Sequence, residues 1–155
     1  MHPLINRRAG YRSAHGFTLV ELMVTCAIVA ILLGIALPSY SVFMKQSRRS
    51  ETESALMDIA QRQQAYLLDQ RAYAPSLGTL NTSVPVDVTS YYTVSLCAAA
   101  PPAACTPPAG TPPAFFAVAI PLAGTAQAGD YTLFIDNTGA KNALDSSGNP
   151  VANIW

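Results

Sequence analysis

The feature that most constrains this chain is an uninterrupted apolar run near its N-terminus. From Phe17 to Leu37 the sequence holds 21 residues, and Glu21 is the only charged one. As an α-helix, a run of this length extends roughly 31 Å, about the thickness of a bilayer's hydrocarbon core. A carboxylate in hydrocarbon costs on the order of 2.5–3.5 kcal/mol and is usually paired and functional. The run therefore predicts a membrane-spanning helix in which Glu21 has a partner.

The residues that precede the run have the character of a targeting leader. Residues 1–16 are short, basic through three arginines, and end in Gly16. An ordinary secretory signal has a shorter apolar core, of about 7–15 residues, and is cut after that core. A cut after Ala36 is the alternative, and it would remove Glu21 together with the whole run. We expect the leader to be 1–16.

The charge and the histidines exclude several classes of function. Without the three leader arginines, 9 − 3 = 6 basic residues face 9 acidic ones, so no basic field remains to hold nucleic acid. Both histidines, His2 and His15, lie in the leader. The rest of the chain has no Cys-His pair and no glycine-rich phosphate loop. We therefore expect no enzyme, no cofactor, no small-molecule substrate and no nucleic-acid ligand.

The helix is expected to continue beyond the apolar run. Pro38 removes one backbone hydrogen bond and, with Gly34 one turn earlier, predicts a kink. Over 39–71, helical spacing gathers apolar side chains on one face and puts most charges elsewhere. The members of that face are Leu56, Ile59, Ala60, Gln63, Tyr66 and Leu67. This predicts a single helix of about 50 residues, whereas a coiled coil, the rival interpretation, lacks a persistent heptad.

The second half of the chain predicts an antiparallel sheet. A proline-punctuated loop over 72–89 leads to alternating segments at 90–96, 114–120 and 131–135, with a short fourth strand at 140–143. The expected apolar faces are Tyr92, Val94 and Leu96; Phe116, Val118 and Ile120; and Tyr131, Leu133 and Ile135. Such a sheet needs a lid, which the amphipathic helix supplies.

The expected fold class is therefore α+β. A long N-terminal helix, half transmembrane and half amphipathic, packs on a three- or four-stranded antiparallel sheet. Its domains are the leader 1–16, the transmembrane or assembly helix 17–38 and a globular head 39–155. The head consists of the helix 39–71, the loop 72–89 and the sheet region 90–155.

The three cysteines have separate interpretations. Cys26 lies in the apolar run and is expected to act as a small hydrophobic residue. Cys97 and Cys105 flank an Ala/Pro segment, and in an oxidising compartment they would close a small ring worth about 2–3 kcal/mol. Two thiols without a nearby histidine make a poor metal site. The loop 97–113 is then either a presented surface or a tolerated insertion, and the sequence leaves both open.

The acids of the head show no evident partner or metal site. Asp87, Asp130, Asp136 and Asp145 all lie at the edges of loops. The oxygen-bearing side chains near the C-terminus match no EF-hand spacing, so we expect no calcium site and no other metal; they are Asp136, Asn137, Asp145, Ser146 and Asn149.

The start of the apolar run resembles the processing site of type IV prepilins, a class III signal peptide. The residues that carry the resemblance are Gly16-Phe17-Thr18-Leu19-Val20-Glu21-Leu22-Met23. In that family a membrane aspartyl peptidase cuts after the glycine and methylates the new terminal Phe. The resemblance implies cleavage at Gly16, N-methylation of Phe17, and assembly roles for Thr18 and Glu21. Pro38 also falls where the family commonly has a helix-bending proline.

A looser resemblance links the head to minor pilins of the PilE kind. It rests on Tyr91-Tyr92-Thr93-Val94 and on Asp136-Asn137-Thr138-Gly139-Ala140-Lys141. The cysteine that major pilins usually carry near the C-terminus is missing, which favours a minor pilin. The resemblance implies as partners a prepilin peptidase, other pilin subunits and an inner-membrane assembly platform.

The physics of Glu21 agrees with an assembly role. Cleavage after Gly16 would create an ammonium group on Phe17, and burying either charge alone is expensive. Pairing Glu21 with the ammonium of its own or a neighbouring subunit relieves both, and it fixes the stagger between subunits. The alternative is a simple single-pass anchor whose Glu21 reaches the interface.

The predicted function is thus a structural subunit of a type IV pilus, most like a minor pilin. The alternatives are a pseudopilin of type II secretion and a competence pilin for DNA uptake, which the charge balance disfavours. The expected location is a single pass in the inner membrane with a periplasmic head, followed by a cell-surface pilus of a Gram-negative bacterium. The sequence does not decide copy number, position in the filament, or the motility, adhesion, uptake or secretion system served.

Overall fold

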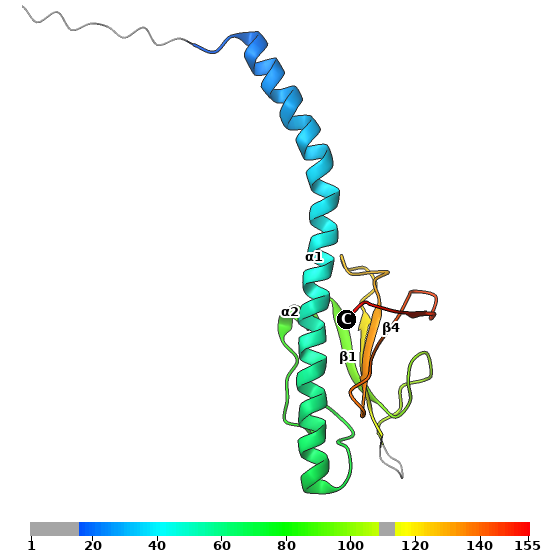
Figure 1. Ribbon diagram of the computed structural model, residues 1–155. Helices are drawn as coiled ribbons and strands as arrows, with labels where there is room; N and C mark the ends of the chain where they lie inside the picture. Colours follow the sequence, from blue (N-terminus) through cyan, green and yellow to red (C-terminus); the bar gives the residue numbers. More distant parts are fainter. Residues whose placement is uncertain (1–15, 109–113) are drawn as a thin grey trace, which may run out of the picture. The chain divides into compact units, whose positions relative to one another are not determined.

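The computed structural model describes residues 16–108 and 114–155 (Figure 1). The leader up to His15 and the 109–113 part of the proline-rich loop lie outside the described residues. The chain divides into two compact units, one ending at Tyr40 and the other comprising Ser41–Trp155. The second unit is called the head below.

One helix runs through both units. Helix α1 (Leu19–Gln70) has 52 residues, which confirms the expected helix of about 50. It ends where Arg71 takes the left-handed conformation, with φ of 56°, while its amide still donates to the Leu67 carbonyl. The helix is continuous through Gly34 and Pro38, and the kink expected there stays a prediction.

The head contains an antiparallel sheet of five strands in sequential order. They are β1 (Tyr92–Cys97), β2 (Phe116–Pro121), β3 (Thr132–Asp136), β4 (Lys141–Leu144) and β5 (Pro150–Val151), with a short helix α2 (Val86–Thr89) before them. The first four agree with the predicted segments to within two residues at either end. The count of three or four was wrong, because Pro150 and Val151 also pair with Leu144 and Ala143. A two-residue strand that begins with proline leaves no alternation to detect.

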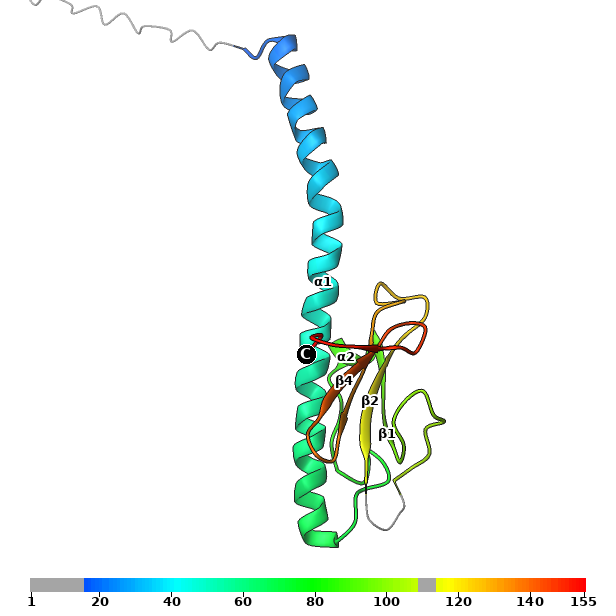
Figure 2. The same cartoon turned by 45° about the vertical axis from the view of Figure 1, so that its right-hand side comes forward.

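The C-terminal half of α1 covers one face of the sheet (Figures 1 and 2). Leu56 and Ile59 of the helix are buried against the sheet, as the predicted helix face required. From the strands, Tyr92, Leu133 and Ile135 join the same core. The helix and sheet thus have the expected α+β arrangement, with the core between them.

Strand β2 presents the face opposite to the predicted one. Ala117 and Ala119 face the helix, each with 0% exposure. Val118 and Phe116 lie on the other face, in a second cluster with Cys97, Phe134 and Leu144. Ile120, on that same face, is 46% exposed. The expectation was wrong because both faces of β2 are apolar, and alternation alone does not tell which face packs against the helix.

Candidate functional site

The predicted processing and assembly residues gather at the start of α1. Gly16, Phe17 and Thr18 precede the helix, and Glu21 lies in its first turn. The Thr18 hydroxyl oxygen accepts a hydrogen bond from the Glu21 amide at 3.2 Å, and the Thr18 carbonyl accepts one from the Leu22 amide. Thr18 is therefore the N-cap, and Thr-x-x-Glu is the sequence of a capping box.

This cap gives Thr18 and Glu21 a local role that the sequence analysis missed. A hydroxyl at the N-cap satisfies one amide that has no partner within the helix. The positive end of the helix dipole stabilises an acid in the first turn. The Thr-x-x-Glu spacing was the available signal. The cap fixes where the helix begins, which is two residues after Phe17.

The first unit offers a continuous apolar surface without cover. Every described residue from 16 to 37 is exposed, and the large apolar side chains between Leu19 and Leu37 are 51–75% exposed. This far exceeds the single exposed apolar residues that are normal on soluble proteins. By length and composition, α1 is apolar enough to cross a membrane. The surface requires lipid or other helices around it.

A buried polar cluster lies in the head where α1 meets the loop between β2 and β3. Two bonds join Arg49 to the Asp130 carboxylate, one from Nη2 at 2.6 Å and one from Nε at 3.3 Å. The Tyr92 hydroxyl donates to Asp130 at 2.7 Å, and the Gln127 amide nitrogen contacts the same carboxylate. Asp130 is 9% exposed. The expectation that Asp130 has no partner was wrong, because the partner lies 81 residues away in the chain.

The cluster shifts the pKa of three of its members. Burial alone would raise the pKa of Asp130, but hydrogen bonds from Arg49 and Tyr92 and the charge of Arg49 hold it below its usual value. Burial and the neighbouring carboxylate raise the pKa of Tyr92. Burial opposes the charge on Arg49, yet bonding to Asp130 raises its pKa. The carboxylate thus stays ionised, and the cluster works as a fixed structural link.

Two other acids close turns of the sheet. The Asp136 carboxylate accepts from the amides of Thr138 and Ala140, and Asp145 accepts from those of Ser147 and Asn149. Both carboxylates therefore have backbone partners, contrary to expectation. No three His, Cys, Asp or Glu side chains of the described residues are grouped as metal ligands would be.

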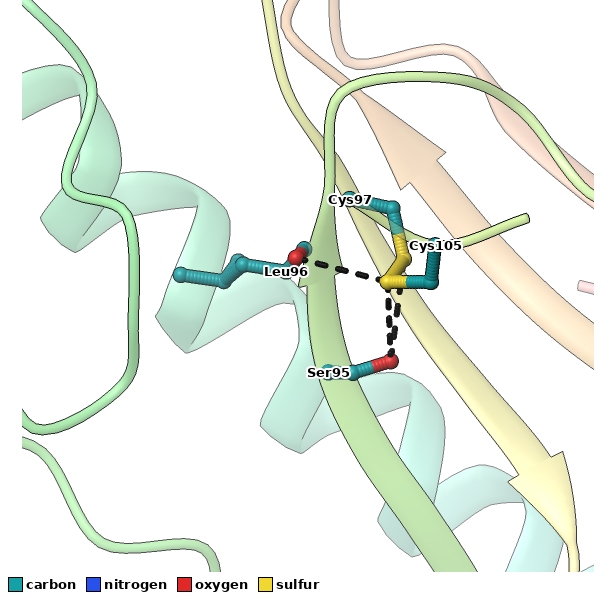
Figure 3. The surroundings of a disulfide bond; sticks show 4 residues. All are labelled: Ser95, Leu96, Cys97 and Cys105. Atoms are coloured by element: carbon teal, nitrogen blue, oxygen red, sulfur yellow. Dashed lines mark hydrogen bonds between the residues drawn. A yellow bond between two sulfur atoms is a disulfide. The ribbon is translucent and has the colours of Figure 1, made fainter. Parts of the chain in front are cut away.

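The predicted disulfide between Cys97 and Cys105 is present (Figure 3). It joins the end of β1 to the loop that follows. The Cys105 sulfur lies 3.5 Å from the Leu96 carbonyl oxygen, and the Ser95 hydroxyl lies 3.7 Å from both sulfurs. Cys26 is a free cysteine on the exposed apolar part of α1.

Beside the disulfide loop, the face of the sheet away from α1 carries a groove of about 490 Å³. The prolines of the loop form one wall and the turn after β4 forms another. Its lining includes Pro101, Pro102, Val118, Ile120, Leu144 and Asp145, and contains no lysine or arginine.

Comparison with known proteins shows the family. The long helix with an exposed apolar start and a helix-on-sheet head define a pilin-like class. Residues 11–37 match the model of the prokaryotic N-terminal methylation motif. Residues 38–132, 95 of the 155, match the model described as "Type IV minor pilin ComP, DNA uptake sequence receptor". Since that match covers more than half of the chain, the protein belongs to this family of type IV pilins.

Several individual pilins are also similar. The chain is 32% identical over 82 residues to the type IV wide pilus major component PilA4 of Thermus thermophilus, covering 50% of this chain and 63% of that protein. It is 36% identical over 59 residues to the type IV major pilin protein PilA of Myxococcus xanthus, covering 38% of this chain and 27% of the relative. These matches span less than two thirds of either relative. A solved type IV pilin from Shewanella oneidensis aligns with a TM-score of 0.47 and 22% identity, over 72% of this chain and 97% of the other.

Proposed function

We propose that the protein is a minor subunit of a type IV pilus, cut after Gly16 and assembled through the first part of α1. The observation that carries the proposal is the uncovered apolar helix that begins directly after Gly16-Phe17. Its large side chains are left exposed by the described residues, so they would be buried in lipid before assembly and among other helices after it.

Glu21 would set the position of each subunit in this bundle. Once Gly16 is removed, the new ammonium on Phe17 lies four residues before the Glu21 carboxylate. Because Thr18 caps the helix, Glu21 is held in its first turn. The ammonium of one subunit can then meet the carboxylate of its neighbour, which neutralises both charges in an apolar medium. The pair also selects one stagger between helices.

The helix itself suits close packing at Gly34. A side chain at this position would meet no atom within 4 Å, so contacts within the described chain do not require glycine there. Small residues allow helices to approach each other closely in membranes and bundles. Together with Pro38, Gly34 is the proposed place where the helix bends during assembly.

The proposal implies partners and a location. A prepilin peptidase would cut and N-methylate the chain, other pilin subunits would surround the first part of α1, and an inner-membrane platform would drive assembly. The chain would first span the inner membrane with its head in the periplasm of a Gram-negative cell, and then enter a surface pilus. No catalytic step or cofactor is assigned to it.

Mass spectrometry of the protein from membranes and from sheared pili tests the proposal. We expect an N-terminus at Phe17 with one added methyl group in both fractions, and a low ratio of this chain to the most abundant pilin. An intact leader in functional pili would contradict processing, and an equal or higher ratio would contradict the minor role.

The family description makes DNA reception a second candidate function. The head, however, has six basic and eight acidic residues. Of the basic ones, Arg49 and Arg62 are paired with acids, while Arg48 lies over the Tyr91 ring and Lys141 over Trp155. Sequence-independent DNA affinity grows with the number of phosphates neutralised, so we expect weak or no binding.

Gel-shift assays with the processed chain in detergent would decide between the two roles. The expected result is no shift at physiological salt. Binding that weakens steeply as salt rises would contradict this expectation and favour DNA reception.

A further inference from the structure

We propose that the end of the head nearest to Ser41 is a lipid-contacting surface, which rests on the headgroup layer of a bilayer that contains anionic phospholipid. This surface, called the foot below, comprises Val42, Phe43 and Lys45 of α1 together with Ala126 and Ala128 of the loop between β2 and β3. This inference depends on the proposed function in one respect: the apolar helix that precedes the foot must be inserted in the membrane.

The loop of the foot is unusually free of polar side chains at its surface. It follows β2 as Leu122-Ala123-Gly124-Thr125-Ala126-Gln127-Ala128-Gly129-Asp130. Ala123, Ala126 and Ala128 are exposed, as are both glycines. Gly124 and Gly129 have φ of 79° and 74°, so they are required by the loop's backbone. The loop's one charge, Asp130, is buried. A nine-residue surface loop of a water-facing domain ordinarily exposes charge, and this one exposes none.

The polar cluster fastens this loop to α1 near the start of the head. The Gln127 side chain, with 0% exposure, donates to the Lys45 carbonyl at 3.2 Å and to the Tyr92 hydroxyl at 2.9 Å. The Lys45 ammonium reaches the Ala128 carbonyl at 3.4 Å. Together with the Arg49–Asp130 pair, these bonds hold the loop beside the helix, at the end of the head toward Ser41 (Figure 1).

The helix contributes apolar side chains at the same level. Val42 and Phe43 are each 66% exposed, although both belong to the head. Phe43 follows Leu37, the last residue of the apolar run, by six residues, or about 9 Å along a helix. Each interfacial layer of a bilayer is roughly 5–8 Å thick. On a helix that continues along the bilayer normal, Phe43 therefore lies at or just beyond the outer boundary of that layer, within reach of the headgroups.

The charges of the foot select an anionic surface. Between Ser41 and Ser50 the chain has three basic residues and no acid. Asp130 neutralises Arg49, and Arg48 lies over the Tyr91 ring, so the cation of the foot is Lys45, which pairs with no acid in the described parts of the chain. Lysine side chains reach from an apolar level to lipid phosphates, and anionic lipids attract such groups near the surface.

A neighbouring protein subunit is the other conceivable occupant of this surface. Protein interfaces depend on large anchors, chiefly tryptophan, tyrosine and arginine, seated in pockets. The fully exposed residues of the loop are only alanine and glycine. A loop without exposed charge beside the half-buried Lys45 fits a lipid surface better.

Tryptophan quenching by brominated lipids tests the foot directly. The chain has one tryptophan, so Trp155→Phe removes all tryptophan fluorescence. Single tryptophans can then be introduced as reporters, one in each variant. The processed full-length chain is placed in nanodiscs that contain phosphatidylglycerol. The reporters are Ala126→Trp and Phe43→Trp in the foot, Leu68→Trp near the other end of α1, and Val29→Trp in the apolar run. Leu68 is 84% exposed and serves as the control in water.

We expect strong quenching at 126 and 43 by lipid brominated near the headgroup, and quenching at 29 by lipid brominated deep in the chain. Quenching at 68 should stay at the level of a water-exposed residue. Adding Gln127→Ala should reduce quenching at 126 and leave it unchanged at 43, because it frees only the loop. Lys45→Gln should reduce quenching at 126 in anionic nanodiscs, and Lys141→Gln should not.

The outcomes separate this proposal from the proposed function. If position 29 is quenched while position 126 behaves like position 68, the chain is anchored but the foot does not touch lipid. If position 29 is not quenched, the membrane anchor itself is wrong. If quenching at 126 is equal in anionic and zwitterionic nanodiscs and does not respond to Lys45→Gln, the preference for anionic lipid is overturned.

Discussion

The two halves of α1 use leucine in opposite ways. Leu32, in the first unit, is 60% exposed, whereas Leu56, in the head, is 0% exposed in the core between helix and sheet. Both are apolar residues of one helix, so local propensity does not distinguish them. The head buries its apolar side chains within its own chain. The first unit requires its burial partner from outside, and its stability therefore depends on lipid or on neighbouring subunits.

The largest expected effect comes from Glu21, the one charged residue of the apolar run 17–37. We predict that Glu21→Val leaves cleavage after Gly16 intact but strongly reduces incorporation into pili, because the ammonium on Phe17 loses its partner. Immunoblots of sheared pili against membranes measure this ratio. Asp69→Val, an exposed acid near the other end of α1, is the matched control and should incorporate normally. Normal incorporation of Glu21→Val would show that assembly does not require a charge pair between Glu21 and the ammonium on Phe17.

The second prediction compares how Leu56 and Leu32 contribute to the free energy of unfolding of the head. Leu56→Ala leaves a cavity in the core and should lower the free energy of unfolding of the head by about 2–5 kcal/mol. Leu32→Ala should leave that free energy unchanged, since Leu32 belongs to the first unit and is 60% exposed. Denaturant unfolding of the detergent-solubilised chain, followed by the fluorescence of Trp155, reports on the head alone, because Trp155 packs against its core. An equal loss in both variants would mean that the units are not independent.

The third prediction concerns the buried pair of the head. Asp130→Asn leaves Arg49 without its counter-charge and should destabilise the head by about 3 kcal/mol at neutral pH. Asp58→Asn breaks the exposed pair with Arg62 and should cost about 0–1 kcal/mol, so it is the control. Both effects are read from the same unfolding curves.

The pH dependence of Asp130 has a definite sign. Its pKa is lowered in the folded state, so its stabilising contribution is present above the unfolded value of about 3.9 and is lost as the pH falls through the folded value. The wild-type head should therefore lose more stability below about pH 4 than Asp130→Asn does. Parallel acid curves would show that folding does not lower the pKa of Asp130.

Sequence patterns anticipate features that depend on neighbours in the chain. The 52-residue helix, the four longer strands and the disulfide follow from apolar spacing, strand alternation and the isolated pair of cysteines. The Thr18 cap could also have been predicted from the Thr-x-x-Glu spacing of Thr18 and Glu21. These features need only local physics.

Features that depend on distant partners were not predictable. Ala117 and Ala119 belong to the core between helix and sheet, and alternation alone cannot identify that face because both faces of β2 are apolar. Asp130 and Arg49 meet only after the sheet has formed. Strand β5 depends on pairing with β4 and has no local pattern. The fold was therefore more predictable than the polar contacts that hold its loops.

The fourth prediction tests the Cys97–Cys105 disulfide of the head. Replacing Cys97 and Cys105 together by serine opens a ring with a sequence separation of 8 and should reduce stability by about 2.5 kcal/mol from loop entropy. Cys97 also belongs to the second apolar cluster, so the double Cys→Ala variant separates ring opening from the burial of a serine hydroxyl. Cys26→Ala, in the first unit, is the control and should leave the unfolding curve of the head unchanged.

The smallest effect is expected at the start of α1, where Thr18 caps the helix. Thr18→Ala removes the acceptor for the Glu21 amide, and loss of an N-cap costs about 1 kcal/mol, or roughly a fivefold rise in local opening. Hydrogen exchange at the Glu21 amide should quicken by about this factor. Thr25→Ala is the matched control, because the Thr25 hydroxyl donates to the Leu22 carbonyl within the helix and caps nothing. If Thr18→Ala also impairs incorporation into pili while Thr25→Ala does not, the cap helps to present Glu21 to the neighbouring subunit. If exchange quickens but incorporation is unchanged, the cap is only local, and the charge pair alone joins the first unit to its neighbours.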